Sequence, residues 1–327
     1  LYTGTHIFFS ESLQTFVQDL HRARPTLFIS VPRLWLKFQL GVLDKFPQQK
    51  LDRLLKIPIV RGIVSKKIKE GLGLGDVRLA GSGSAPLPAD LIEWYEKIGL
   101  PIVEGYGMSE DFAYSHATIP GKGRFGYVGS PMPGVEVKIS DEGEILIKSP
   151  GNMMGYYKQP EMTAECYTED GYFRTGDRGE RDEEGRLKIT GRVKELFKTS
   201  KGKYVAPAPI ENLLNNHSEV ELCCVTGSGN PQPYALILPA EELRPKLSEP
   251  AERERFEGEL TRLLDSVNKE VEGFERLQFL VVVKEPWQIE NGFLTPTMKI
   301  KRSKIEDTYS PNNDAWYAAG KRVVWED

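Results

Sequence analysis

The chain has 327 residues, of which 39% are hydrophobic and 28% charged, and its formal net charge is −4. This length suggests about two domains, and the composition is that of an ordinary soluble globular protein. So mild a charge does not indicate a nucleic-acid surface, and no apolar run approaches the length needed to cross a bilayer.

The cysteines and histidines exclude two further classes. Cys166, Cys223 and Cys224 form an odd set with one adjacent pair, which is not a disulfide framework and indicates a reducing, cytoplasmic location. No histidine lies near a cysteine at ligand spacing, so a zinc site is not expected. The chain begins LYTGTHIFF without an initiator methionine, and we expect it to be part of a longer protein.

Helical and extended patterns alternate over the first 110 residues. Apolar residues recur every three or four positions in the helical segments, and short apolar runs separate them. The predicted elements are helices over 10–22, over roughly 34–70 with breaks near Pro47 and Pro58, and over 89–98, with strands over 26–31, 77–80 and 101–105. This alternation is typical of a mostly parallel α/β layer.

The pattern changes twice further along the chain. From about residue 125, VEVKI, GEILIKS, GYFRTGD and GRLKIT predict an antiparallel sheet or small barrel. After GRVK at 191–194, a compact α+β unit is predicted, and a domain boundary is expected there. Its predicted elements are helices over 209–216 and 251–272 and strands over 219–225, 233–238 and 276–283.

Two glycine-rich loops each follow a predicted strand: GSGSAP at 81–86 and GYGMSE at 105–110. Loops at the carboxyl ends of parallel strands are where ligands bind. Tyr106, Ser109 and Glu110 would suit a base, a phosphate and Mg²⁺ respectively. Taken alone, GSGSAP is equally consistent with a plain connector. For GYGMSE the alternative is a glycine-eased turn capped by its serine and glutamate, which we favour less than a functional loop.

Two other motifs favour ordinary structural roles when taken alone. YFRTGD at 172–177 is typical of a turn that closes a strand, although Asp177 could instead accept hydrogen bonds from a ribose diol. LTPTMKIKR at 294–302 carries Lys299, Lys301 and Arg302, and such short basic clusters are usually solvated surface.

Taken together and in order, these motifs carry a resemblance. GSGSAPLP, GYGMSE, YFRTGD, GRVKELFKTSKGKYVAP and LTPTMKIKR resemble the core motifs of the adenylate-forming superfamily, which includes acyl-CoA synthetases, firefly luciferase and peptide-synthetase adenylation domains. RPTLFISVPRLW at 24–35, GRVKELFKTSKGKYVAPAPIE and LTPTMKIKR are most similar to long-chain fatty acid CoA ligases. The family's upstream loop, which ends in Pro-Lys-Gly and grips the ATP phosphates, is absent from these residues.

The resemblance therefore implies the C-terminal portion of such an enzyme, an α/β protein in three parts. Residues 1–124 would be the last part of a large α/β domain, 125–192 its small antiparallel β subdomain, and 193–327 a mobile α+β lid. In the implied reaction, the carboxylate of a long-chain fatty acid attacks the α-phosphate of ATP to give acyl-adenylate and pyrophosphate, with Mg²⁺ present. The thiol of coenzyme A then displaces AMP to give acyl-CoA. A fragment without the phosphate loop is expected to be inactive alone.

The resemblance also assigns roles to single residues. Glu110 matches the Mg²⁺ ligand, and Lys299 the catalytic lysine that bridges the substrate carboxylate and the α-phosphate. Lys194 matches the hinge, Lys198 and Gly202 the coenzyme A path, while Lys301 and Arg302 keep the interpretation as solvated surface. The implied nucleotide contacts are Gly83, Ser84, Ala85, Tyr106, Gly107, Ser109, Asp177 and Arg192.

Other functions remain open from the sequence. A non-catalytic nucleotide-binding module of the same fold would differ in class, whereas an acyl-AMP, medium-chain or aryl-acid ligase would differ only in substrate. No nucleic-acid partner is expected. No basic amphipathic helix is clear enough to predict membrane-surface contact.

Overall fold

The chain divides into two compact units. Unit 1 consists of Leu1–Thr175 and Gly179–Ile189, and unit 2 of Gly176–Arg178 and Thr190–Asp327. None of the described helices combines the length and the apolarity that a membrane span requires. The computed structural model describes residues 4–12, 15–83, 87–295 and 298–326.

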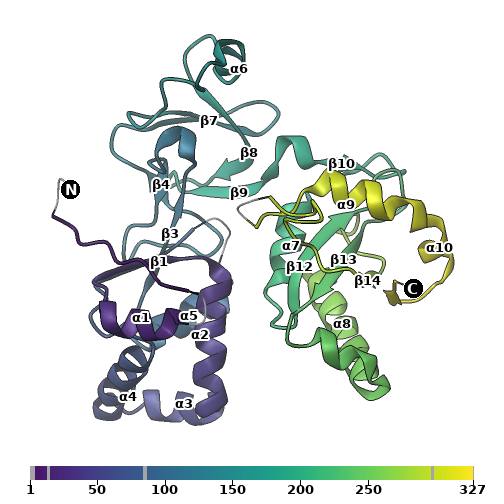
Figure 1. The fold of residues 1–327 in the computed structure, drawn as a ribbon. Helices are drawn as coiled ribbons and strands as arrows, with labels where there is room; N and C mark the ends of the chain where they lie inside the picture. The colour runs from purple at the N-terminus through teal and green to yellow at the C-terminus, as the bar shows by residue number, and fades with distance from the viewer. Residues whose placement is uncertain (1–3, 13–14, 84–86, 296–297, 327) are drawn as a thin grey trace. The chain divides into compact units, whose positions relative to one another are not determined.

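Unit 1 contains the predicted mostly parallel α/β layer (Figure 1). Strands β1, β2 and β3 are parallel neighbours, and β4 and β5 extend the same sheet in antiparallel pairing. Pro47 precedes α3 and Pro58 begins α4, which confirms the predicted helix breaks. The elements are β1 Leu27–Ser30, β2 Leu79–Ser82, β3 Ile102–Tyr106, β4 His116–Ala117, β5 Ser130–Pro131, α1 Phe16–Ala23, α2 Pro32–Lys45, α3 Gln48–Leu55, α4 Pro58–Gly71 and α5 Ala89–Lys97.

The core of this layer fixes the end of β2. Trp35 and Tyr95 are fully buried, and their rings meet edge to face with centroids 5.1 Å apart. Trp35 Nε1 donates a hydrogen bond to the Gly81 carbonyl at 3.2 Å, and Tyr95 Oη donates to the Trp35 carbonyl at 2.7 Å. Because a buried polar group left without a partner is costly, these bonds hold the backbone where the first glycine-rich loop begins.

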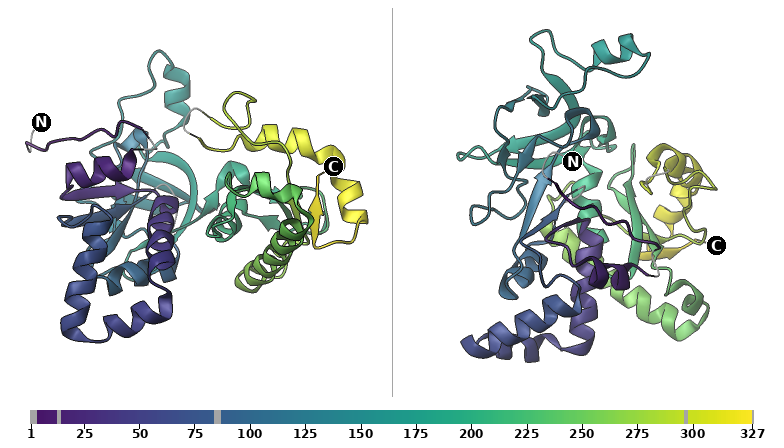
Figure 2. Two further views of the ribbon diagram at one scale, coloured as in Figure 1. Left: turned by 60° about the horizontal axis from the view of Figure 1, so that its bottom comes forward. Right: turned by 60° about the vertical axis from the view of Figure 1, so that its left-hand side comes forward.

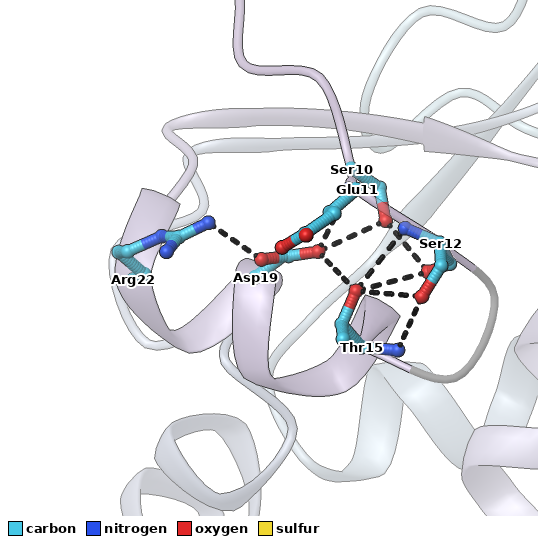
Figure 3. A network of polar contacts seen from close by, with 6 residues as sticks. All are labelled: Ser10, Glu11, Ser12, Thr15, Asp19 and Arg22. Carbon is cyan, nitrogen blue, oxygen red and sulfur yellow. Dashed lines mark hydrogen bonds and ion pairs between the residues drawn. The ribbon is translucent and has the colours of Figure 1, made fainter.

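A polar network around Asp19 ties the segment before α1 to that helix (Figure 3). Asp19 Oδ2 accepts hydrogen bonds from the Glu11 N–H at 3.0 Å and from Thr15 Oγ1 at 2.8 Å. Ser10 Oγ donates to the same oxygen at 3.2 Å, and Arg22 Nη2 lies 2.7 Å from Oδ1. The Glu11 N–H contributes most to lowering the pKa of Asp19, so this carboxylate stays ionised.

A second sheet follows in the order β6, β7, β8, β9, and β6 pairs with β7 in antiparallel orientation, as predicted. Its interior is a small apolar cluster that includes Ile145, Phe173 and Leu187. The elements are β6 Glu136–Ile139, β7 Glu144–Lys148, α6 Pro160–Glu165, β8 Phe173–Arg181 and β9 Leu187–Arg192.

The prediction of a turn at YFRTGD is wrong. Residues Phe173–Arg181 form one continuous strand, β8, and Asp177 lies inside it. Gly176 takes a φ of 71°, which a glycine adopts at little cost, so the backbone changes direction locally without leaving the sheet. Pairing with neighbouring strands outweighed the local preference of Gly-Asp for a turn.

Unit 2 is built around one mixed four-stranded sheet in the order β12, β13, β14, β15, in which only the first pair is antiparallel. Helices α7 and α8 and strands β12–β14 match predicted segments, whereas α9, α10 and β15 were not predicted. The elements are β10 Phe197–Lys198, β11 Tyr204–Val205, α7 Pro207–Asn215, β12 Val220–Thr226, β13 Tyr234–Pro239, α8 Pro250–Glu270, β14 Leu280–Val282, α9 Arg302–Tyr309, α10 Asn313–Ala318 and β15 Val323–Trp325.

Helices cover both faces of this sheet, with the green helix α8 on one side and the yellow helices α9 and α10 on the other (Figure 2). On one face, Cys223 and Val225 join a cluster with Phe256 of α8. On the other, Cys224 joins a cluster with Tyr309 of α9 and Trp316 of α10. Since successive strand residues point to opposite faces, the near-continuous apolar run of β12 and β13 follows from burial on both sides.

Candidate active site

The glycine-rich loops begin side by side at the carboxyl ends of β2 and β3. Ser82 pairs in register with Glu104, and an added Cβ on Gly83 would lie 3.5 Å from the Gly105 carbonyl oxygen. Adjacent parallel strands therefore deliver both loops to the same edge of the sheet, where ligands bind in such folds. Ser84 and Ala85 lie outside the described residues.

Gly107 is required for the shape of the second loop. A Cβ at this position would lie 2.6 Å from the Cα of Ala113, a distance that backbone atoms cannot accommodate. The turn that follows, Ser109–Asp111, is capped by the buried Asp111, which accepts a hydrogen bond from the Met108 N–H at 2.8 Å. The cap is therefore Asp111, and not the Ser109 and Glu110 pair of the less favoured alternative for this loop.

Glu110 has a partner that the sequence did not reveal. Tyr156 Oη donates to Glu110 Oε1 at 2.9 Å, and the Met153 N–H donates to the Glu110 carbonyl at 2.7 Å. Burial and then the Glu110 carboxylate raise the pKa of Tyr156 to about 12, so the phenol keeps its proton. Tyr156 lies 46 residues further along the chain, and no local pattern links the two.

Buried polar groups lie directly beneath these loops. Glu104 is 6% exposed and accepts a hydrogen bond from the Leu87 N–H at 2.9 Å, which holds the residue after the first loop. His116 pairs in register with Tyr106, and its ring lies 6.0 Å from the tyrosine ring between centroids. Burial raises the pKa of Glu104 to about 7 and lowers that of His116 to about 4.

Replacing Glu104 by glutamine should stabilise the protein at pH 8 more than at pH 5. The folded carboxyl keeps its proton up to about pH 7, whereas the unfolded one loses it above 4.5. Stability therefore falls as the pH rises through this window, by roughly 3 kcal/mol in all, and glutamine removes that loss. His116 gives stability the opposite pH dependence, a rise between about pH 4 and pH 6.5. This contribution is the same in the parent and in Glu104→Gln, so it cancels when their stabilities are subtracted.

Urea unfolding at several pH values, followed by hydrogen exchange in peptides from β2 and β3, measures the effect. Glu93→Gln on the exposed face of α5 is the matched control and should leave the pH profile unchanged. A stability difference between Glu104→Gln and the parent that stays constant from pH 5 to 8 would contradict the burial argument.

In unit 2, the structure brings together two of the predicted nucleotide contacts. Arg192 Nε lies 3.2 Å from Asp177 Oδ1, with the arginine side chain 54% and the aspartate 16% exposed. Pairing at this level of exposure contributes little to stability, about 0–1 kcal/mol. The pairing does orient the Asp177 carboxylate and the Arg192 guanidinium toward each other. Arg192 directly precedes the turn Val193–Glu195, which contains the predicted hinge residue Lys194.

Lys198 and Gly202 share the small hairpin formed by β10 and β11. Gly202 has a φ of 77°, and its N–H donates to the Thr199 carbonyl at 2.9 Å, so the glycine makes the turn. The Lys198 ammonium lies 5.4 Å from the ring centroid of Tyr204. Both predicted residues of the coenzyme A path therefore lie on one element, and Lys198 is exposed.

Lys299 lies on a hydrogen-bonded loop at the surface of unit 2. Leu294 and Ile300 form an antiparallel bridge, and the Thr295 N–H donates to the Lys299 carbonyl at 2.8 Å. The Lys299 N–H in turn donates to Thr295 Oγ1 at 3.1 Å. Both backbone groups of Lys299 are thus hydrogen-bonded, while its side chain is exposed. The Lys299 ammonium pairs with no carboxylate in the part of the chain that the structure describes.

The interpretation of Arg302 as solvated surface is wrong. Its side chain is 14% exposed and contacts both carboxylate oxygens of Glu211, at 2.7 and 2.9 Å. It also donates to the Val225 carbonyl at 2.8 Å. Burial alone would lower the pKa of Arg302, but the Glu211 carboxylate raises it, so the arginine stays charged. Lys301, by contrast, is exposed as predicted.

Known protein families match both units. Residues 1–157 match the family described as AMP-binding enzyme, and residues 195–321 match the AMP-binding enzyme C-terminal domain. Together these matches take in most of the chain, including every predicted site residue except Asp177, Arg192 and Lys194.

Named relatives extend the comparison. A peroxisomal long-chain acyl-CoA synthetase of Arabidopsis thaliana is 32% identical over 97% of this chain and 52% of its own length. A long-chain fatty-acid CoA ligase of Homo sapiens is 31% identical over 96% of this chain and 51% of its own length. The chain thus spans about half the length of these curated relatives.

Solved structures give the same fold. The adenylation domain of a carboxylate reductase from Mycobacterium chelonae is 27% identical with a TM-score of 0.71, and covers 94% of this chain and 49% of its own. The corresponding domain from Segniliparus rugosus, in complex with AMP and a co-purified carboxylic acid, is 26% identical with a TM-score of 0.70, over 95% of this chain and 50% of its own.

Proposed function

The chain belongs to the AMP-binding enzyme family, and from this membership we propose that the protein activates a long-chain fatty acid as its acyl-adenylate and transfers it to coenzyme A. The observation that carries the proposal is the pair of glycine-rich loops at the carboxyl ends of adjacent parallel strands, which presents Tyr106, Ser109 and Glu110 at one edge of the sheet. The names of the relatives favour a long-chain substrate.

The residues of unit 1 would bind the nucleotide. Half-buried Tyr106 offers a ring for adenine, while exposed Ser109 offers a hydroxyl to a phosphate. Gly83 and Gly107 let the ligand approach backbone N–H groups closely. The resemblance extends the same role to Ser84 and Ala85.

Glu110 suits the Mg²⁺ that such a reaction uses. Tyr156 occupies Oε1, and Oε2 has no hydrogen bond among the described residues. Mg²⁺ is commonly held by one or two carboxylates together with substrate phosphates, so a single positioned glutamate fits. The bound ion would neutralise phosphate charge, and the contribution of the protein is to hold this carboxylate with the Tyr156 phenol.

The residues of unit 2 would act on ribose, phosphate and coenzyme A. Asp177 can accept two hydrogen bonds from a ribose diol while Arg192 keeps its carboxylate oriented. Lys299 would stabilise the negative charge that builds between the substrate carboxylate and the α-phosphate. We retain the division at 1–124, 125–192 and 193–327, with Lys194 as hinge and Lys198 and Gly202 beside the coenzyme A path once the lid has turned.

Product analysis of the protein expressed from its complete coding sequence tests the proposal. Carboxylates from benzoate through octanoate to stearate are supplied with ATP and Mg²⁺, with coenzyme A present and then omitted. We expect AMP and acyl-CoA, with the highest kcat/KM for the long chains.

The alternatives give different products. Acyl-AMP that accumulates equally with and without coenzyme A would indicate an acyl-AMP ligase, and a preference for octanoate or benzoate would reassign the substrate. Nucleotide binding without any turnover would indicate a non-catalytic module. The 327 residues alone, which contain no loop ending in Pro-Lys-Gly, are expected to show no pyrophosphate exchange.

A further inference from the structure

A cavity of about 650 Å³ lies in unit 1, away from the candidate active site. It is lined by α4 and by the segments that precede β2 and β3, including Gly75, Asp76 and Gly99. These segments lie at the amino ends of the parallel strands, whereas the glycine-rich loops lie at the carboxyl ends. Figure 1 shows α4 at the lower end of this unit and β4, which pairs with the end of β3, above it.

One face of α4 supplies the polar groups of the cavity. Arg61, Ser65 and Lys69 recur every four residues and so lie above one another on the helix. Gly62 lies on the same face, and a Cβ added there would meet no atom within 4 Å, which leaves room for a ligand. Ser65 is 8% exposed, and its Oγ has no hydrogen-bond partner among the described residues.

The charge of the lining favours an anion. The cavity contains four cationic side chains and two carboxylates. Both carboxylates form ion pairs, Asp76 with Arg24 at 2.8 Å and Glu70 with Lys66 at 3.8 Å. Arg61 and Lys69 pair with no carboxylate in the described ranges; the Lys69 ammonium donates only to the Gly99 carbonyl, at 3.3 Å. Two cations and a buried hydroxyl therefore remain for a ligand.

We propose that this cavity binds a phosphate group through Arg61, Ser65 and Lys69. The planar guanidinium of an arginine matches phosphate oxygens, lysine adds a compact charge, and the serine hydroxyl gains the hydrogen bond it otherwise lacks. The phosphate could belong to a free anion or to a lipid headgroup, because Ile59 and Ile63 on the same helix are 81% and 66% exposed beside the cavity. This site is independent of the proposed catalytic function.

Charge placed inside the cavity tests the site without disturbing the core. Gly62→Glu adds a carboxylate where the structure has open space, and Gly62→Gln is its neutral counterpart of equal size. A second matched pair is Arg61→Gln, in the cavity, and Lys67→Gln, an exposed residue of α4 that does not line it. Both glycine replacements favour the helix, so the variants should fold.

Binding is measured by calorimetry with inorganic phosphate and by flotation with phosphatidic acid vesicles, using phosphatidylcholine vesicles as the reference. We expect Gly62→Glu and Arg61→Gln to weaken binding about tenfold or more, while Gly62→Gln and Lys67→Gln bind as the parent does. An effect confined to calorimetry identifies a free phosphate, and one confined to the vesicles identifies a lipid headgroup. Absence of binding in both assays, or equal losses in Gly62→Gln and Lys67→Gln, overturns the proposal.

Discussion

Replacing Lys299 by alanine in the protein expressed from its complete coding sequence should slow adenylation by about 10²- to 10³-fold, the usual cost of removing one positioned donor to transition-state charge. Formation of acyl-CoA from supplied acyl-AMP should continue at the parental rate. The reason is that Lys299 has an ordered backbone and an exposed ammonium without a carboxylate partner among the described residues. Its charge is therefore available to a substrate rather than engaged in holding the fold.

The two half-reactions must be measured separately, by pyrophosphate exchange and by thioester formation. Lys301→Ala is the matched control, because Lys301 is also exposed, two residues away, and its hydrogen bonds to the described residues use its backbone alone. Its N–H donates to the Phe293 carbonyl at 2.7 Å, and its carbonyl accepts from the Ile305 N–H at 3.1 Å. Equal losses in both half-reactions, or the same loss in Lys301→Ala, would reject the assignment of Lys299 as the adenylating residue.

Replacing Arg302 by methionine should destabilise unit 2 by about 3–5 kcal/mol, because the change leaves a buried carboxylate without its counter-charge. Glu211 accepts three hydrogen bonds, two from Arg302 and one from the Val225 N–H at 2.7 Å. Glu195 lies 3.7 Å from the same guanidinium. Methionine fills a similar volume but cannot pair with either glutamate. The loss of stability therefore measures the missing charge rather than a packing defect.

A double-mutant cycle with Glu211→Met isolates the pair. Urea unfolding of the 327-residue chain is followed by hydrogen exchange in peptides that cover β12 and α9. The double variant should be less destabilised than the sum of the two single variants, since neither charge is then left alone. Lys304→Met, an exposed position on α9, should change stability by less than about 0.5 kcal/mol. Strictly additive losses would show that the pair does not stabilise the unit through its charges.

The sequence predicted those elements whose limits are set by nearby residues. The limits between α2, α3 and α4 could be predicted because proline is not tolerated inside a helix, and Pro47 and Pro58 stand at the starts of α3 and α4. Strands β2 and β3 could be predicted because each is a short apolar run that leads into a glycine-rich loop. The segment after residue 302 is largely polar, and its helices form against a sheet face built from β12, β13 and β14, which lie earlier in the chain. Nothing local predicts β15 or its parallel pairing with β14.

The site shows the same limit. The resemblance separated Lys299 from its basic neighbours, but the burial of Arg302 depends on Glu211, 91 residues earlier, and could not be read from the motif. Similarly, GYGMSE predicted a carboxylate at Glu110 but neither the Asp111 cap nor the Tyr156 phenol. The roles of the nucleotide and coenzyme A residues stay predictions that the experiments above decide.

The two neighbouring cysteines of β12 bear on the chemical reactivity of the chain. Burial raises the pKa of both the Cys223 and Cys224 thiols, and each points into a different core, so they cannot join in a disulfide while the strand is extended. A thiol reagent would reach partly exposed Cys166 first. Cys223 would react only after α7, whose Glu211 carbonyl accepts from its thiol at 3.5 Å, leaves its face of the sheet. Cys224 would react only after α9, whose Arg302 contacts its sulfur at 3.3 Å, leaves the other face. In the sequence, this pair contributed to the inference of a reducing compartment. In the fold, both thiols are buried, so the pair would resist disulfide formation in an oxidising environment as well.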